Sequence, residues 1–114
     1  MKYEVIDGRG IILDSVTEIG KDAFKGCTSL QSIEIHNSVT EIGDEAFRDC
    51  TGLLSIVIPN SVTVIGENAF SGCSSLQSIV IPDSVTQIDG SIFSGCIYNH
   101  RTTKTNQKYP SVNL

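Results

Sequence analysis

Several constituents of ordinary proteins are scarce or missing in this chain of 114 residues. It has no Trp, one Met and three Pro, and aromatic residues make up only 6% of it. A buried core must therefore be built mainly from aliphatic side chains. No apolar run approaches the roughly 20 residues that a membrane-spanning helix needs, and the N-terminal stretch does not resemble a secretion signal. We expect no membrane insertion, and the missing signal favours the cytoplasm.

Positive charge is also scarce over most of the chain. Residues 1–96 hold all 13 acidic residues and 5 of the 8 Lys and Arg, a balance of −8, whereas residues 97–114 hold three cations and no acid, a balance of +3. Nucleic-acid binding needs a basic face, so we expect no nucleic-acid partner. A composition of 39% apolar and 18% charged residues is typical of one globular domain.

What the chain does have is a repeat of 23 residues. Eight columns of identical residues recur with this step. They are Cys at 27, 50, 73 and 96; Phe at 24, 47, 70 and 93; Val at 16, 39, 62 and 85; Ile at 19, 42, 65 and 88; Ser at 15, 38, 61 and 84; Leu at 30, 53 and 76; and Ile at 33, 56 and 79 and at 35, 58 and 81. So many columns in phase indicate a stacked repeat architecture.

Each unit divides into three parts. The segment "LQSIVI" (76–81) alternates around two Ile residues, which is typical of a strand with one buried face. "PDSVTQI" (82–88) combines a turn with a second short extended piece. "GENAFSGC" (66–73) predicts one or two turns of helix, because acids precede its apolar pair. One such unit cannot bury its own apolar face, so the units must stack.

The pattern L-x-x-I-x-I-P-x-S-V-T-x-I-G-x-x-A-F-x-x-C, seen at 53–73 and 76–96, resembles the BspA-like class of leucine-rich repeats. The resemblance implies a repeat solenoid, made mainly of short parallel β-strands on a concave side, with short helical turns on the outer side. It also implies a surface-associated, adhesive protein without catalytic activity. A cell-surface or secreted location follows from the resemblance, against the cytoplasmic one favoured above, so the compartment stays open.

The repeat departs from its pattern at both ends. Gly10 stands where a buried Ile belongs, and Asp7 occupies the Leu column; after Cys96 the pattern stops, with Asn99 in place of Leu. We therefore interpret residues 1–14 as a partial or capping repeat, 15–96 as the leucine-rich repeats and 97–114 as a degenerate C-terminal cap or a disordered tail.

The four cysteines suggest a metal site or a redox pair at first sight. Residues spaced by one repeat form a straight column with parallel Cβ vectors, which can neither wrap an ion nor bring two sulfurs together. Free Cys also behaves as a small hydrophobe. We predict four reduced, slowly reacting thiols, with no metal and no cofactor.

The outward positions of the predicted strands form the candidate binding face. They make three columns: Ser32, Ser55 and Ser78; Glu34, Val57 and Val80; and His36, Pro59 and Pro82. The hypothesis is a concave face with an apolar centre at Val57 and Val80 and a polar edge at Glu34 and His36. The alternative is an ordinary solvated sheet face, since scattered exposed apolar residues are normal.

No catalytic set can be assembled from the sequence. His36 and Glu34 could form a dyad, but we interpret them as a surface pair, because catalysis needs a pocket and a third orienting group. We predict that the chain is not an enzyme but an adhesive interaction module that binds another protein or a surface glycan. The alternative is a structural element that forms homo-oligomers by pairing of uncapped solenoid ends.

Overall fold

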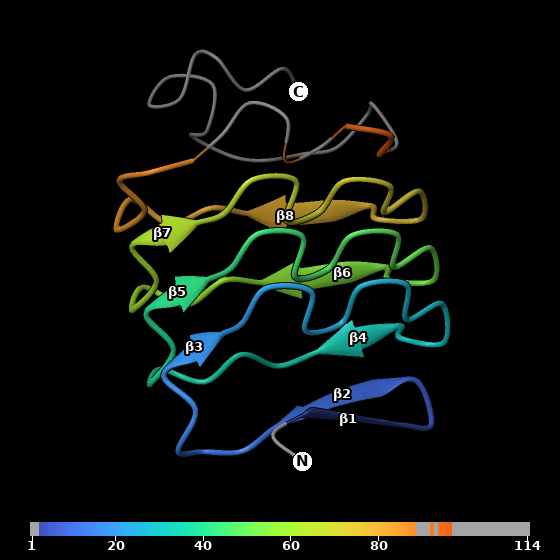
Figure 1. Cartoon of the computed structure of the whole chain (residues 1–114), viewed down its shortest axis with the longest axis horizontal. Coiled ribbons are helices and arrows are strands. Elements are labelled where there is room, and N and C mark those ends of the chain that lie inside the picture. Colours follow the sequence, from blue (N-terminus) through green and yellow to red (C-terminus); the bar gives the residue numbers. More distant parts are fainter. Residues whose placement is uncertain (1–2, 89–91, 93, 97–114) are drawn as a thin grey trace.

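The chain folds as a stack of coils, each of 23 residues, around one shared core (Figure 1). The structure is a computed structural model that describes residues 3–88, 92 and 94–96. The predicted tail at 97–114 lies outside the described residues, and the division at residues 14 and 96 stays an interpretation. Among the described residues, no helix is long and apolar enough to cross a bilayer.

Two rows of short strands run along the stack. We call β2, β4, β6 and β8 the front row and β3, β5 and β7 the back row (Figure 1). The strands are β1 (Tyr3–Ile6), β2 (Arg9–Ile12), β3 (Glu18–Ile19), β4 (Ser32–Ile33), β5 (Glu41–Ile42), β6 (Ser55–Val57), β7 (Val64–Ile65) and β8 (Ser78–Val80). They form the sheets β1-β2-β4, β3-β5-β7 and β6-β8, and a bridge between Glu34 and Val57 continues the front row from β4 to β6.

Every parallel pair keeps the register of the sequence repeat. Ser55 pairs with Ser78, and Ile42 pairs with Ile65. Equivalent side chains therefore lie one above another, about 4.8 Å apart along the rows. The fold class predicted from the sequence, a leucine-rich repeat solenoid of short parallel strands, is confirmed.

The core is a set of columns in which each side chain packs on its own copy. Phe24, Phe47 and Phe70 stack with ring centroids 5.3 Å apart and planes 5° and 3° from parallel. Leu53 and Ile42 are likewise fully buried in columns of their own kind. Aliphatic columns supply the rest of the core, as the scarcity of aromatic residues requires.

The segments that carry the Ala-Phe pair form successive turns rather than the predicted helical turns. The N–H groups of Ala46 and Arg48 donate to carbonyls three residues earlier, whereas those of Glu45 and Phe47 donate to the next coil. Glu45 has a φ of 57°, which a helix does not allow. No α-helix occurs in the described ranges. The neighbouring coil accepts the hydrogen bonds that a helix would have kept within itself.

The close approach of neighbouring coils requires glycine at the end of the back-row strands. A Cβ on Gly66 would lie 2.5 Å from the amide nitrogen of Asp44, and one on Gly43 would lie 2.8 Å from that of Lys21. Gly43 and Gly66 instead donate their N–H groups to the carbonyls of Ile19 and Ile42 in the preceding coil. The Ile-Gly pair of the repeat is therefore a point of backbone-to-backbone contact.

An antiparallel hairpin covers the first coil. β1 pairs with β2 through Tyr3 and Ile12, so it occupies the edge at which a preceding coil would pair. The Tyr3 hydroxyl accepts the Gly20 N–H at 3.0 Å and donates to the Glu18 carbonyl at 3.2 Å. Its ring also meets Phe24 edge-on, at 5.3 Å. Tyr3 thus supplies to Gly20 the acceptor that a backbone carbonyl supplies in later coils.

The first coil also lacks one core side chain. Gly10 pairs with Ile33 in the front row, at the position where later coils have Ile. A Cβ at Gly10 would lie 2.8 Å from Cδ1 of Ile33 and 2.9 Å from Cδ1 of Leu30. The second coil therefore fills the space that the missing side chain leaves.

Replacing the middle ring of the phenylalanine column tests its contribution. Phe47→Ala is expected to lower the free energy of unfolding by about 3–5 kcal/mol, because it removes a fully buried ring and both of its stacking contacts. Urea denaturation measures the change. Leu54→Ala, at a side chain that is 46% exposed, is the control and is expected to change the value by about 0.5 kcal/mol or less.

Removing one oxygen tests the hairpin cap. Tyr3→Phe keeps the ring on Phe24 but leaves the Gly20 N–H without its acceptor, so we expect a loss of about 1–2 kcal/mol. Amide hydrogen exchange is the measurement, with faster exchange expected at Gly20 and unchanged exchange at Gly66. Equal protection of Gly20 in both proteins would show that the hydroxyl does not cap the coil.

Candidate binding groove on the front row

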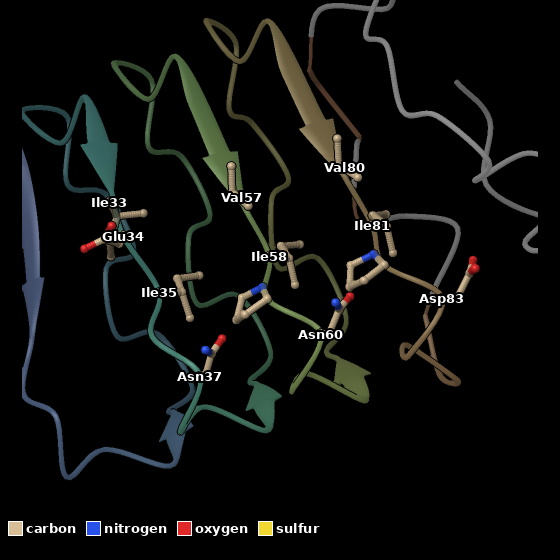
Figure 2. A pocket seen from close by; sticks show the side chains of 12 residues that line it. Ile33, Glu34, Ile35, Asn37, Val57, Ile58, Asn60, Val80, Ile81 and Asp83 are labelled. Atoms are coloured by element: carbon tan, nitrogen blue, oxygen red, sulfur yellow. The ribbon is translucent and has the colours of Figure 1, made fainter.

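A groove of about 800 Å³ crosses the front row at the end of its strands (Figure 2). Four positions from each of three successive coils line it. These are Ile33, Glu34, Ile35, Asn37, Val57, Ile58, Pro59, Asn60, Val80, Ile81, Pro82 and Asp83. The groove therefore runs along the stack, across the strands rather than parallel to them.

Alternation along each strand places the apolar centre of the groove. Val57 is 71% exposed, whereas its neighbours Ile56 and Ile58 are 3% and 4% exposed and face the core. Val80, at 46% exposure, repeats the arrangement one coil further on. Two β-branched apolar side chains thus lie next to each other on the surface, and the backbone of Val57 pairs with Glu34 on one side and with Val80 on the other.

Proline ends the strand pairing beside this apolar centre. Pro59 and Pro82 have no N–H to give to a ladder, so each marks the end of a front-row strand. Their carbonyls accept the N–H groups of Val62 and Val85, which closes a tight turn. Both prolines line the groove together with the two valines.

A polar border follows the prolines. Asn37, Asn60 and Asp83 occupy the next column, and all three are exposed. Glu34 lies at one end of the groove, in the same column as Val57 and Val80 but one coil before them (Figure 2). The groove consequently has an apolar floor with one carboxylate toward each end, and no Lys or Arg among the described residues lines it.

Arg9 lines a smaller hollow that shares Glu34 with the groove, and two further cations lie on the turn segments, outside the groove lining. Lys25 donates to Glu45 at 2.8 Å, and Arg48 donates to the same carboxylate at 3.1 Å. The hydrogen bond from Lys25 lowers the pKa of Glu45, and the same bond raises the pKa of Lys25. Lys25 and Arg48 are therefore paired with Glu45, outside the groove, and do not line it beside its carboxylates.

His36 does not point its ring into the groove as a free polar group. Its Nε2 lies 2.8 Å from the carbonyl oxygen of Leu13, and its Nδ1 accepts the N–H of Ser38 at 3.3 Å. A neutral ring with its proton on Nε2 satisfies both contacts. The side chain ties the first coil to the second, and neither nitrogen bonds to Glu34.

A family model for the BspA type leucine rich repeat region, in six copies, matches residues 9–111. The chain belongs to the BspA-type leucine-rich repeat family. A comparison with curated proteins gives no match.

Solved structures of three leucine-rich proteins have similar folds. A leucine-rich repeat protein from Bacteroides ovatus ATCC 8483 is 36% identical, with a TM-score of 0.71 over 81% of this chain and 25% of that one. A leucine rich cell surface protein from Faecalibacterium prausnitzii A2-165 is 29% identical, with a TM-score of 0.71 over 94% and 35%. A T. pallidum leucine-rich repeat protein is 28% identical, with a TM-score of 0.59 over 81% and 63%. This chain thus spans between a quarter and just under two thirds of their lengths.

The structure brings together some of the predicted site residues of this BspA-type repeat and separates others. Glu34, Val57 and Val80 line one groove, together with the two prolines of the third column. Ser32 and His36 line an adjoining hollow of about 360 Å³, which shares Glu34 with the groove. Ser55 and Ser78 are exposed on the same face but lie outside the groove lining.

Sequence reasoning missed two apolar residues on the same face and the polar border. Ile11 and Leu13 are 37% and 51% exposed, and the register of β2 with β4 extends the face to them. The signal was present, because they stand one repeat before Glu34 and His36. The irregular first unit of this BspA-type array concealed it. Asn37 and Asn60 were not among the predicted site residues; they stand two repeats and one repeat before Asp83, in the part of the repeat that predicts a turn.

The cysteine column is internal, and no residues suited to a metal site surround it. Cys50 and Cys73 are buried, Cys27 and Cys96 are half-buried, and all four are free thiols. The Sγ atoms of Cys50 and Cys73 donate to the carbonyls of Phe24 and Phe47, each at 3.1 Å. Within the described part of the chain, no three His, Cys, Asp or Glu residues are grouped to hold a metal ion.

Thiol labelling in the folded protein tests the column. Burial raises the pKa of Cys50 to about 12, so roughly one Cys50 thiol in ten thousand is ionised at pH 8. Cys27 is less buried, and burial raises its pKa also. With iodoacetamide and peptide mapping, we expect Cys27 to react before Cys50, and all four to react in urea. Equal rates for Cys27 and Cys50 without urea would contradict the burial order.

Proposed function

We propose that the chain is a non-catalytic interaction module that binds another protein through the front-row groove. The observation that carries the proposal is the exposure of Val57 and Val80, at 71% and 46%, in a groove of about 800 Å³. Exposed apolar side chains gathered inside a polar margin are typical of interaction sites. The leucine-rich repeat architecture is consistent with a protein-interaction role.

The way in which the groove is built supports binding. Its floor belongs to three coils that are joined by parallel pairing and core columns, so its shape exists before a partner arrives. A preformed surface loses little conformational entropy on binding. The similar F. prausnitzii protein is a cell surface protein, and we extend a surface-associated, adhesive role to this chain as part of the proposal.

Self-assembly is the second candidate function, and one observation favours it. β1 is the outermost strand of its sheet, so among the described residues its outer edge pairs with no strand. Such an edge can accept a strand from another copy. The β1–β2 hairpin, however, blocks the parallel continuation of the coils that the uncapped-end hypothesis requires. The opposite end of the stack lies outside the described residues.

A double substitution tests the groove. Val57→Arg with Val80→Arg places two cations on the apolar floor and is expected to weaken binding by at least tenfold, while the thermal melt changes little because both side chains are exposed. The measurement is surface plasmon resonance against a panel of immobilised surface proteins and glycans.

Leu54→Arg is the matched control. Leu54 is as exposed as Val80, at 46%, but it lies outside the groove lining. Binding that survives Leu54→Arg and is lost in the double variant establishes the groove. A partner bound equally by all three proteins refutes the proposal. An empty panel, together with a particle size that grows with concentration in light scattering, favours self-assembly instead.

A further inference from the structure

We propose that the groove recognises an extended peptide segment in which an aliphatic side chain is flanked by lysine or arginine. The inference rests on the proposed function and specifies the chemistry of the partner. The aliphatic side chain would pack on Val57 and Val80, and the cations would lie toward Glu34 and Asp83.

The charges around the groove select for a cationic partner. Its lining includes Glu34 and Asp83 but no Lys or Arg. Residues 50–88 contain two acids, Glu67 and Asp83, and no Lys or Arg at all. Among the described residues of this lining, a cationic partner therefore meets no Lys or Arg, and the charged groups that an acidic partner meets are carboxylates. Arg9 lies outside this lining, in the smaller hollow that shares Glu34 with the groove. Complementary charge of this kind gives specificity and faster association.

The positions of the two carboxylates define the spacing of the cations. Glu34 and Asp83 belong to coils two steps apart, so their rows are separated by about 10 Å along the stack. An extended peptide advances about 3.3 Å per residue. The two carboxylates lie toward opposite ends of the groove (Figure 2), and they are also offset along the strands, because Asp83 is in the column of Asn37. Cations three to five residues apart, with the aliphatic side chain between them, would match this spacing.

The lining of the groove favours a peptide over a glycan. No aromatic ring is among the lining residues, so the groove lacks the flat platform on which sugar rings stack. Its floor of two valines and two prolines instead matches aliphatic side chains in shape and polarity. Anionic glycans would in addition be repelled by both carboxylates. The row of Asn37 and Asn60 offers amide donors and acceptors to a peptide backbone.

Peptide binding to the full chain tests the inference. The probes are fluorescein-labelled peptides with two lysines separated by two, three or four residues, with valine–proline in the intervening positions. Two reference series replace both lysines by glutamate, or the valine and proline by glycine and serine. Fluorescence anisotropy is expected to show saturable binding for the lysine–valine series, at least tenfold weaker binding for each reference series, and weaker binding at higher salt.

A charge-matched pair of variants separates the groove from the net charge of the protein. Glu34→Gln with Asp83→Asn removes the two groove carboxylates and is expected to weaken binding of the lysine–valine peptides about fivefold or more. Glu18→Gln with Glu67→Gln removes two exposed carboxylates outside the groove and is expected to leave binding unchanged. Circular dichroism melts check that all variants fold.

The failure of this inference can be told apart from the failure of the proposed function. Equal binding of the lysine and glutamate peptides, or equal effects of the two variant pairs, overturns the inference. Protein partners that are lost in the Val57→Arg, Val80→Arg double variant, without any binding of the lysine–valine peptides, also overturn it, but they leave the groove as an interaction site of different chemistry.

Discussion

The structure depends on one constraint, the hydrogen bonding of each coil to the next with a step of 23 residues. The front row, the back row and the turn segments all obey it, through pairs such as Ser55 with Ser78, Ile42 with Ile65, and Phe47 N–H with the Ala69 carbonyl. Because no side of the coil can shift alone, most buried side chains lie on a residue of their own kind. The stacked phenylalanines and the thiol column both follow from this backbone register.

The same constraint turns single residues into surfaces. An outward valine in one coil would be an ordinary exposed side chain, but Val57 and Val80 become a continuous floor because their coils are adjacent. The prolines and the Asn37–Asn60–Asp83 column add two further parallel bands. A change at one position of the repeat therefore alters one band of the groove and leaves the core columns intact, which lets the surface vary while the fold is kept.

Much of this fold could be predicted from sequence, because the columns of identical residues define both the strands and their buried faces. The exposure of Val57 between Ile56 and Ile58 followed from alternation alone. The helical turn at 66–73 was predicted wrongly, since acids before an apolar pair suit a helix and also suit turns whose N–H groups bond to a neighbouring coil. His36 was placed on the correct face, but alternation says nothing about a ring that turns back to the Leu13 carbonyl. The groove depends on side chains of three coils together, which no single repeat specifies.

Identical coils do not by themselves define a single stacking order. A coil that matches all its neighbours could stack one whole repeat out of place, or between the coils of another molecule. The irregular residues of the first units remove this ambiguity. Gly10 leaves the space that the Ile33 side chain fills, the Tyr3 hydroxyl bonds to Glu18 and Gly20, and His36 bonds to the Leu13 carbonyl. These departures from the repeat distinguish the first coil from the later ones, and a stack shifted by one whole repeat would lose all of these contacts.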